Sequence, residues 1–187
     1  KPKKLPPIEE EEKPFEIPEG WEWVRLEDIT HSGTLNDGDW IVSKDMNENG
    51  NVRLLQLGSI GYGKYINKGF KYITEETFKR LNCREIKEGD ILINRLLRDN
   101  MCVCELPSIE GKVITTVDTC FIRVNDTIYN SKYLLYLFLS KYFQDRVFER
   151  ASGTTRQRIS KGNLITIPFP LPPLAEQKRI VEKVDMI

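Results

Sequence analysis

The sequence predicts an α+β domain with a mixed, strongly curved β-sheet, a few helices and the start of a C-terminal helix. Short apolar runs bounded by turn residues recur from Trp21 to Val124 and are typical of strands. Two stretches with helical spacing interrupt them, one behind Thr74 and one behind Ser131. A third helical stripe follows Pro172-Pro173, a pair that can lead into a helix but cannot lie inside one. Strands interrupted by helices in this way favour the α+β class.

The composition divides the chain into three parts. Residues 1–18 carry five prolines among lysines and glutamates with little to bury, so we expect a linker. Residues 19–170 hold the predicted strands and the first helices, and form the folded domain. Residues 171–187 start a helix with an apolar stripe made of Leu174, Gln177, Ile180, Val181, Val184 and Ile187. The stripe is still running at the last residue, so we expect the chain to be a fragment of a longer protein.

In the first half of the domain, alternating or apolar runs predict strands at 21–26, 40–42 and 52–57. Residues 27–29 fit a helical turn, residues 33–38 a loop, and residues 47–51 have the composition of a turn. The glycine-rich segment 58–65 does not match Gly-x-Gly-x-x-Gly, and no helix opens behind it. It is either a flexible loop whose side chains are free to contact a ligand or a hairpin with glycines at positive φ.

In the second half, Thr74 caps a predicted short helix over residues 75–81. The apolar run 91–95 predicts a buried strand that ends in a polar-tipped loop at 96–100. Further strands are predicted at 101–105, 113–116 and 119–124, with a turn at 125–126. Ser131 caps a predicted long helix over 132–150, and a basic loop that opens on Gly153 follows at 152–158.

The formal net charge is zero, which argues against a non-specific nucleic-acid binder, because such proteins usually carry a basic excess. The charge is unevenly spread, however. Between Lys141 and Pro168 the chain has six basic residues against two acidic ones. This segment indicates a local basic face or, equally, a solvated helix face and loop. No apolar run is long enough for a membrane span, and the polar N-terminal residues lead us to expect no signal peptide.

Residue types that carry catalysis or bind metals do not form a consistent set. Cys83, Cys102, Cys104 and Cys120 contain no Cys-x-x-Cys pair and His31 is the single histidine, so we expect reduced thiols and no metal site. Asp99, Glu110 and Lys112 have a spacing compatible with a magnesium-dependent nuclease, but Glu-x-Lys recurs elsewhere in the chain. The Asp/Asn-Pro-Pro-Tyr/Phe motif of adenine methyltransferases is absent, because leucines flank Pro172-Pro173. We therefore expect no catalytic residue.

Motifs at both ends of the domain resemble one family. Leu171-Pro172-Pro173-Leu174-Ala175-Glu176-Gln177, followed by Lys178-Arg179-Ile180-Val181, resembles the boundary motif of the DNA-specificity (S) subunits of Type I restriction-modification systems. In that family the motif joins a target-recognition domain to a long connecting helix. Further matching elements are Pro18-Glu19-Gly20-Trp21-Glu22-Trp23-Val24-Arg25-Leu26, Gly89-Asp90-Ile91-Leu92, Ser152-Gly153-Thr154-Thr155, Ile159-Ser160 and Ile167-Pro168-Phe169-Pro170. The resemblance therefore brackets almost the whole chain as one target-recognition domain.

The resemblance implies a non-catalytic subunit in the bacterial cytoplasm that binds one half of a split target in double-stranded DNA. It also implies partners, namely modification (methyltransferase) subunits that hold S-adenosylmethionine and a restriction subunit that uses ATP. We expect none of these cofactors on this chain. One alternative is the specificity module of a fused or stand-alone DNA methyltransferase, and another is the nuclease considered above. The target sequence, and the position of the domain as first or second in the subunit, stay open.

DNA recognition needs cationic and hydroxyl side chains on phosphates, and Arg, Lys, Asn or Gln on base edges. Segments that match no shared family motif are the better candidates for reading sequence. The predicted base contacts are Ser59, Tyr62, Asn94, Arg95, Arg98 and Asn100. The predicted phosphate contacts are Lys64, Thr154, Thr155, Arg156, Gln157, Arg158 and Lys161. Two alternatives stay open, because Arg95 can form a salt bridge inside the domain and the two threonines can act as caps.

Overall fold

The computed structural model describes residues 4–30 and 34–187. The strands in this part are β1 (Glu22–Val24), β2 (Thr34–Asp37), β3 (Val52–Leu55), β4 (Phe70–Ile73), β5 (Ile91–Asn94), β6 (Val103–Glu105), β7 (Val113–Ile114), β8 (Thr119–Arg123) and β9 (Phe169–Leu171). The helices are α1 (Leu26–Ile29), α2 (Glu75–Arg80), α3 (Ser131–Leu139), α4 (Lys141–Glu149), α5 (Lys161–Leu164) and α6 (Leu174–Asp185). Three short 3₁₀ helices are η1 (Glu10–Glu12), η2 (Ser43–Asp45) and η3 (Leu57–Ser59).

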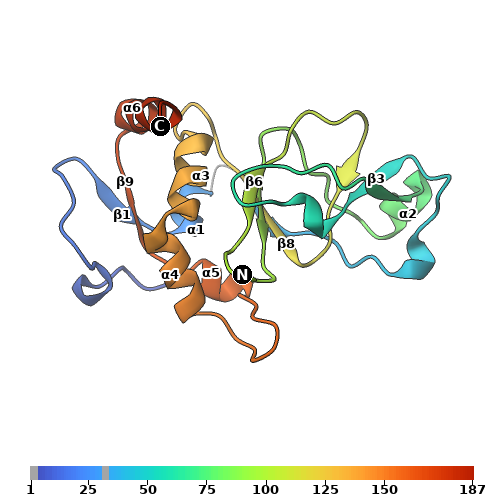
Figure 1. Cartoon of the computed structure of the whole chain (residues 1–187), viewed down its shortest axis with the longest axis horizontal. Helices are drawn as coiled ribbons and strands as arrows, with labels where there is room; N and C mark the ends of the chain where they lie inside the picture. Colours follow the sequence, from blue (N-terminus) through green and yellow to red (C-terminus); the bar gives the residue numbers. More distant parts are fainter. Residues whose placement is uncertain (1–3, 31–33) are drawn as a thin grey trace.

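The strands divide among three sheets, ordered β1-β9, β2-β8-β5-β6 and β4-β3-β7. The first two are antiparallel, whereas β3 pairs antiparallel with β4 and parallel with β7. Figure 1 shows β8 and β6 in the middle of the molecule, α3, α4 and α6 at one end, and β3 with α2 at the other. The predicted α+β class with mixed strand pairing is confirmed.

The inner strands of the four-stranded sheet, β8 and β5, are buried on both faces. On β5, Ile91 and Ile93 join the core cluster that contains the residues of α3 and α4, while Leu92 joins a second cluster with Cys104 and Phe121. Successive side chains of a strand point to opposite faces, so an unbroken apolar run fits a strand covered on both sides. Cys102 and Cys104, which alternate with Val103, both pack on the second cluster.

The predicted single helix over 132–150 is wrong, because the chain breaks at Ser140. This residue has extended backbone angles of φ −64° and ψ 149°, and its hydroxyl accepts from the backbone N–H of Phe143 at 3.3 Å. The break gives two shorter helices, α3 and α4, with aromatic packing between them. The cap of α3 is also one residue earlier than predicted, since the side chain of Asn130 accepts from the backbone N–H of Tyr133 at 3.0 Å.

Two further predictions in the first half are wrong. Residues 34–37 form strand β2, paired with β8, instead of a loop; Gly33 of that predicted loop lies outside the described residues, as does His31. Residues 40–42 form no strand, and the side chain of Trp40 is 72% exposed. Strand β4 occupies residues for which the sequence indicated no element. The prediction that Thr74 caps α2 is confirmed, because its hydroxyl accepts from the backbone N–H of Thr77 at 3.1 Å.

The C-terminal motif ties distant parts of the chain together. Gln177 is 1% exposed; its amide donates to the carbonyl of Pro172 at 2.8 Å and accepts from the backbone N–H of Asn130 at 2.9 Å. The indole of Trp21 donates to the carboxylate of Glu176 at 2.9 Å. Strand β9, directly before the motif, pairs with β1. These contacts explain why glutamate and glutamine stand at the start of α6.

Candidate nucleic-acid interface

Three segments that lie far apart in the sequence meet around one hollow. They are residues 57–66 behind β3, residues 94–102 between β5 and β6, and residues 155–157 behind α4. The backbone N–H of Leu97 donates to the carbonyl of Gln157 at 2.9 Å, which joins the second segment to the third. The hollow measures about 700 Å³ and is lined by Leu57, Gly58, Ile60, Gly61, Tyr62, Ile66, Asn94, Leu96, Leu97, Arg98, Asn100, Cys102, Thr155, Arg156 and Gln157. We call it the recognition hollow.

The segment 58–65 is a tight turn, which agrees with the hairpin alternative. Ile60 and Tyr65 form an antiparallel bridge, and Gly63 has a φ of +80°. Its backbone N–H donates to the carbonyl of Val103 at 2.8 Å. Between these anchors the ring of Tyr62 is 45% exposed, and its hydroxyl donates to the carbonyl of Leu139 at 2.7 Å. The turn therefore holds an accessible aromatic ring in a fixed position. Lys64, at the tip of the turn, is exposed and does not line the hollow.

Two of the predicted base-contact residues are buried, which corrects those two assignments. Ser59 is fully buried and its hydroxyl accepts from the backbone N–H of Lys68 at 3.3 Å. Arg95 is 5% exposed, and its guanidinium donates to Asp37 at 3.1 Å, to the carbonyl of Ile159 at 3.2 Å and to the carbonyl of Val117. A buried charge whose donors are already bonded stays inside the domain, since exposing it would break these bonds. Arg95 thus joins the edge of the central sheet to the segment that follows the basic loop.

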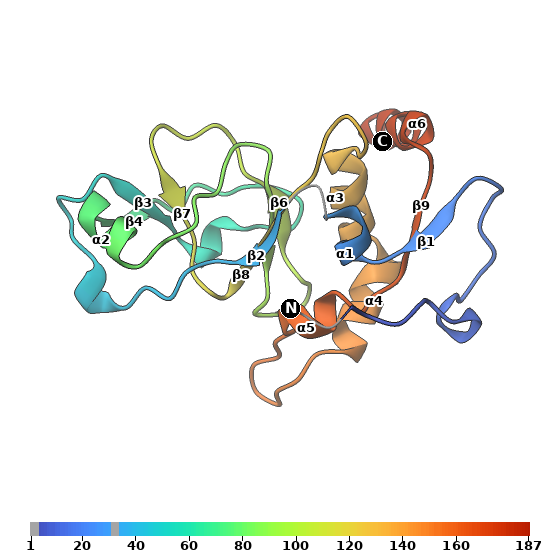
Figure 2. The same cartoon turned by 180° about the vertical axis from the view of Figure 1, so that it is seen from behind.

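The loop 152–158 is a closed turn at the surface. The backbone groups of Ser152 and Arg158 exchange two hydrogen bonds of 2.9 Å, and Gly153 has a φ of +99°. A side chain at Gly153 would also lie 2.3 Å from the carbonyl oxygen of Arg156, so only glycine fits. Figure 2 shows this loop projecting from the end of α4 beside α5.

The side chains of this loop are presented differently. Thr154, Thr155, Arg156 and Gln157 are exposed. The guanidinium of Arg158 pairs with the carboxylate of Asp118 at 2.7 Å, although its side chain is 46% exposed. Lys161 is the first residue of α5 and is half-buried. The loop therefore offers one guanidinium and three polar side chains directly to a ligand.

Several polar groups on the rim of the hollow are available. Within residues 4–30 and 34–187, the side chains of Arg98, Asn100, Arg156 and Gln157 make no hydrogen bond or ion pair. The carbonyl oxygen of the Asn94 side chain accepts from the backbone N–H of Leu96 at 2.9 Å, which leaves its amide donors unused. Polar groups that are unpaired in the protein suit recognition, because no internal bond has to break when they bind.

Gln144, which the sequence reasoning did not single out, fixes the second segment from inside. It lies on α4, is 6% exposed, and accepts from the backbone N–H of Met101 at 2.8 Å. Its amide donates to the carbonyl of Met101 at 3.0 Å and to that of Phe138 at 2.9 Å. The one available signal was a polar residue between Phe143 and Val147 on the apolar stripe of a helix.

The features expected of catalysis or metal binding are not brought together. Lys112 pairs with Glu75 at 2.6 Å and lies over the ring of Phe78, so it belongs to the end of the molecule that contains α2. Among the described residues no group of three or more His, Cys, Asp or Glu side chains is placed to hold a metal ion. Burial raises the pKa of the Cys104 and Cys120 thiols to about 12. No helix in the described part of the chain is long and apolar enough to cross a membrane.

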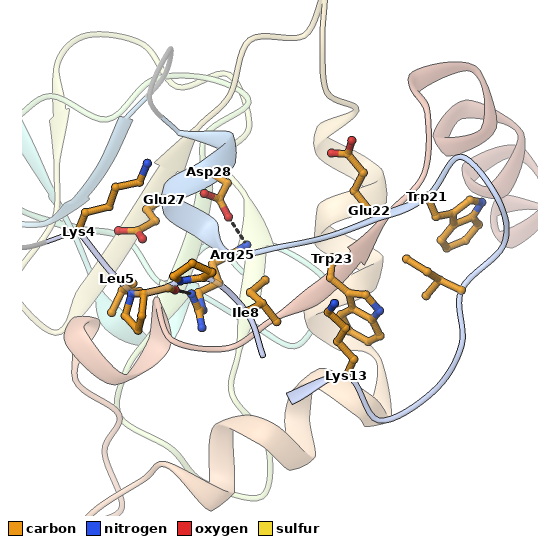
Figure 3. A pocket seen from close by; sticks show the side chains of 13 residues that line it. Lys4, Leu5, Ile8, Lys13, Trp21, Glu22, Trp23, Arg25, Glu27 and Asp28 are labelled. Atoms are coloured by element: carbon orange, nitrogen blue, oxygen red, sulfur yellow. Dashed lines mark hydrogen bonds between the residues drawn. The ribbon is translucent and has the colours of Figure 1, made fainter. Parts of the chain in front are cut away.

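A second hollow, of about 760 Å³, lies between residues 4–17, here called the leader, and the start of the domain (Figure 3). The guanidinium of Arg25 donates to both carboxylate oxygens of Glu12, at 3.0 and 3.2 Å, and is 6% exposed as a residue. The ring of Phe15 packs on that of Trp23 with centroids 5.0 Å apart. No predicted DNA-contact residue lines this hollow, so we assign it to the packing of the leader.

The carboxyl group of Glu12 titrates below its ordinary range. The backbone N–H of Glu9 donates to it at 2.9 Å, and this bond has the largest effect in lowering the pKa. Partial burial opposes the shift, and the hydrogen bond from Arg25 adds to it. The leader is therefore held best when Glu12 is ionised.

Comparisons with known proteins agree on one family. The family model of the Type I restriction modification DNA specificity domain matches residues 18–187. The chain is 28% identical over 184 residues to the Type I restriction enzyme MjaVIII specificity subunit of Methanocaldococcus jannaschii. It is 30% identical over 195 residues to the Type I restriction enzyme EcoAI specificity subunit of Escherichia coli. These alignments cover 92% and 99% of this chain but 40% and 31% of the relatives, so the chain spans less than half of their length.

Solved structures show the same fold. The crystal structure of the HsdS subunit from Thermoanaerobacter tengcongensis has a TM-score of 0.66 and 23% identity, covering 92% of this chain and 38% of that one. A chain from a structure of complex assembly and conformational transition in the type I R-M system has a TM-score of 0.67 at 23% identity, covering 92% of this chain and 39% of that one.

Proposed function

The chain belongs to the Type I restriction modification DNA specificity domain family, and we propose that it reads one half of a split target in double-stranded DNA. The observation that carries the proposal is the recognition hollow, where 94–102 and 155–157, joined by a backbone hydrogen bond, present guanidinium and amide groups that are unpaired among the described residues, and 57–66 adds Tyr62. Guanidinium and amide groups are the side chains that distinguish base edges. A second domain of the same kind would read the other half of the target.

We assign separate roles to the two polar clusters. Asn94 ends a strand that is buried on both faces, and Arg98 and Asn100 follow it; this placement supports base contact because a rigid support improves discrimination. Tyr62 belongs with them. The second group of polar residues would contact phosphates, and such contacts give affinity and register without sequence information. This group comprises Lys64, Thr154, Thr155, Arg156, Gln157, Arg158 and Lys161.

The proposed subunit binds and does not catalyse. Modification subunits, which hold S-adenosylmethionine, and an ATP-using restriction subunit would act on the DNA in the cytoplasm after this domain has selected it. The contacts of Lys112 with Glu75 and Phe78 support a non-catalytic subunit. Lys112 is the lysine that the nuclease alternative requires, and here it pairs with Glu75 instead. Cleavage or methyl transfer by the purified chain that is lost in Asp99→Ala would contradict the proposal.

The test begins with the target itself. Methylation mapping of a genome that carries the intact system, or selection from a random duplex pool with the purified chain, gives the half-site. Binding of the selected and a scrambled half-site is then measured for Arg98→Ala and Arg156→Ala at two salt concentrations. Arg179→Ala, an exposed arginine on α6 that does not line the hollow, is the matched control.

The two variants are expected to fail in different ways. Arg98→Ala should cost about 1–3 kcal/mol on the selected half-site and little on the scrambled one. Arg156→Ala should weaken both equally and reduce the salt slope by about one ion, because a phosphate contact releases counterions whatever the sequence. If Arg156→Ala alone relaxes specificity, the two roles are reversed. If neither variant differs from the control, the recognition hollow is not the DNA-binding surface.

A further inference from the structure

The recognition hollow has a shape that groove reading does not require. A side chain that reads a base edge in the major groove has to protrude into a channel about 12 Å wide. Here the side chains with unpaired polar groups stand around a recess of about 700 Å³. This volume lies within the range of pockets that enclose small ligands, about 300–1,000 Å³. A recess of this kind fits a group that projects from the DNA.

Part of the lining of the recess, here called the floor, is apolar. It consists of Leu57, Ile60, Ile66, Leu97 and Cys102, of which Ile60 and Leu97 are 3% and 7% exposed and Ile66 is 36% exposed. Burial raises the pKa of the Cys102 thiol, so it stays neutral and adds to the apolar lining. Such a floor suits a flat, weakly polar ring better than a phosphate or a sugar, which need hydrogen-bonding partners on every side.

The wall of the recess carries an immobilised aromatic ring. Tyr62 is bonded through its hydroxyl to the carbonyl of Leu139 at 2.7 Å, and its neighbour Gly63 is bonded to Val103 at 2.8 Å. Tyr62 is nevertheless 45% exposed as a residue. The hydrogen bond to Leu139 therefore fixes a ring that is open to solvent. Rigid, accessible rings are the surfaces on which unpaired bases stack.

The polar residues that line the recess supply two kinds of group, amides and a guanidinium. Asn94 offers two amide donors, because its carbonyl oxygen is already used, and Asn100 offers a complete amide. These groups match the edge of a base. Arg156 is exposed and unpaired within the described residues, and matches a phosphate beside that base.

We propose that the recognition hollow receives one unstacked nucleobase of the bound target, which stacks on Tyr62 and is read by Asn94 and Asn100. This inference rests on the proposed function, since it requires that the chain binds DNA. It adds that one base pair of the half-site is opened by this domain itself, and that specificity at that position comes from the hollow.

The experiment uses the 187-residue chain without modification subunits, so that any opened base is due to this chain. The probes are duplexes with the selected half-site in which each base pair in turn is replaced by a mismatch that keeps the original base on one strand. A mismatch removes the pairing that must otherwise be broken, and so favours a protein that extrudes the base. At one position the affinity should rise about tenfold, which corresponds to about 1.4 kcal/mol. 2-Aminopurine placed at or beside that position should brighten on binding.

Both signals should depend on the ring of Tyr62. They should disappear in Tyr62→Ala and persist in Tyr62→Phe, which keeps the stacking surface and loses only the bond to Leu139. Trp40→Ala removes a more exposed aromatic ring that does not line the hollow, and should leave both signals unchanged. Circular dichroism melts of the three variants establish that each is folded.

The outcomes separate the two proposals. Sequence-specific binding with no mismatch that raises affinity, and no change in fluorescence at any position, would overturn the unstacked base and leave the proposed function standing. The same conclusion follows if Tyr62→Ala behaves like Trp40→Ala. If the chain shows no sequence-specific binding at all, both proposals are wrong.

Discussion

Replacing Gln144 with methionine should destabilise the domain and loosen the segment that carries the proposed base contacts. Methionine is close to glutamine in length and volume, so the change removes hydrogen bonds while leaving packing almost intact. Three bonds of 2.8, 3.0 and 2.9 Å are lost, and they leave the N–H and C=O of Met101 and the carbonyl of Phe138 buried without this partner. At about 1 kcal/mol for each bond, the free energy of unfolding should fall by about 3 kcal/mol.

The assay is urea unfolding followed by tryptophan fluorescence, with thermal melts alongside. For a chain of this size a loss of about 3 kcal/mol lowers Tm by about 6–12 °C. Gln56→Met is the matched control, because Gln56 is half-buried and makes one bond of 3.3 Å, to the carbonyl of Leu54. We also expect trypsin to cleave native Gln144→Met faster than wild type after Arg98, since Met101 anchors that loop. Equal losses of stability in the two variants would refute the reasoning.

Three other perturbations have defined outcomes. Gln177→Leu should lower the free energy of unfolding by about 2 kcal/mol in urea melts, because two buried bonds are lost; a loss below about 0.5 kcal/mol would show that the start of α6 is held by packing alone. The pKa of Glu12 is lowered in the folded chain, so the stability that its ionised carboxylate contributes should be complete above pH 4.5 and lost as pH falls through the folded pKa. The Tm difference between wild type and Glu12→Gln should therefore shrink below pH 4.5. A constant Tm difference from pH 7 to pH 3 would contradict this. Cys104 and Cys120 should resist alkylation at pH 8 until urea unfolds the chain, as followed by mass spectrometry, whereas modification of either at the rate of a free thiol would show that the thiols are accessible.

Local signals identified the elements whose side-chain pattern is decided by near neighbours. The cap at Thr74, the strand 91–94 and the helix behind Pro173 all lie where the sequence places them, because a cap, an apolar run and a proline act within a few residues. The break at Ser140 was missed because both flanking stretches have helical spacing. It is decided by the serine hydroxyl, which bonds Leu137 and Phe143 on either side.

Strand pairing across long distances could not be read in the same way. Thr34–Asp37 looks like a loop in sequence because it contains asparagine and aspartate, yet it forms β2 through four paired residues on β8. Trp40 looks like part of a strand, but it pairs with no strand in the described part of the chain and its side chain stays exposed. Strand formation depends on a partner that the sequence does not place, so composition alone misassigned both segments.

For the candidate site, the sequence by itself determined which segments hold the residue types that can contact DNA, because glycine-opened loops with arginine, asparagine and glutamine are visible without a fold. Only the tertiary structure decided that residues 57–66, 94–102 and 155–157 surround one hollow. It also decided that Arg95 is committed to Asp37 and two carbonyls while Arg98, three residues further along, is unpaired within the described residues. The physical reason is burial: two arginines on one segment have the same chemistry, and they differ because the first directly follows an inner strand that is buried on both faces while the second stands in a loop at the surface.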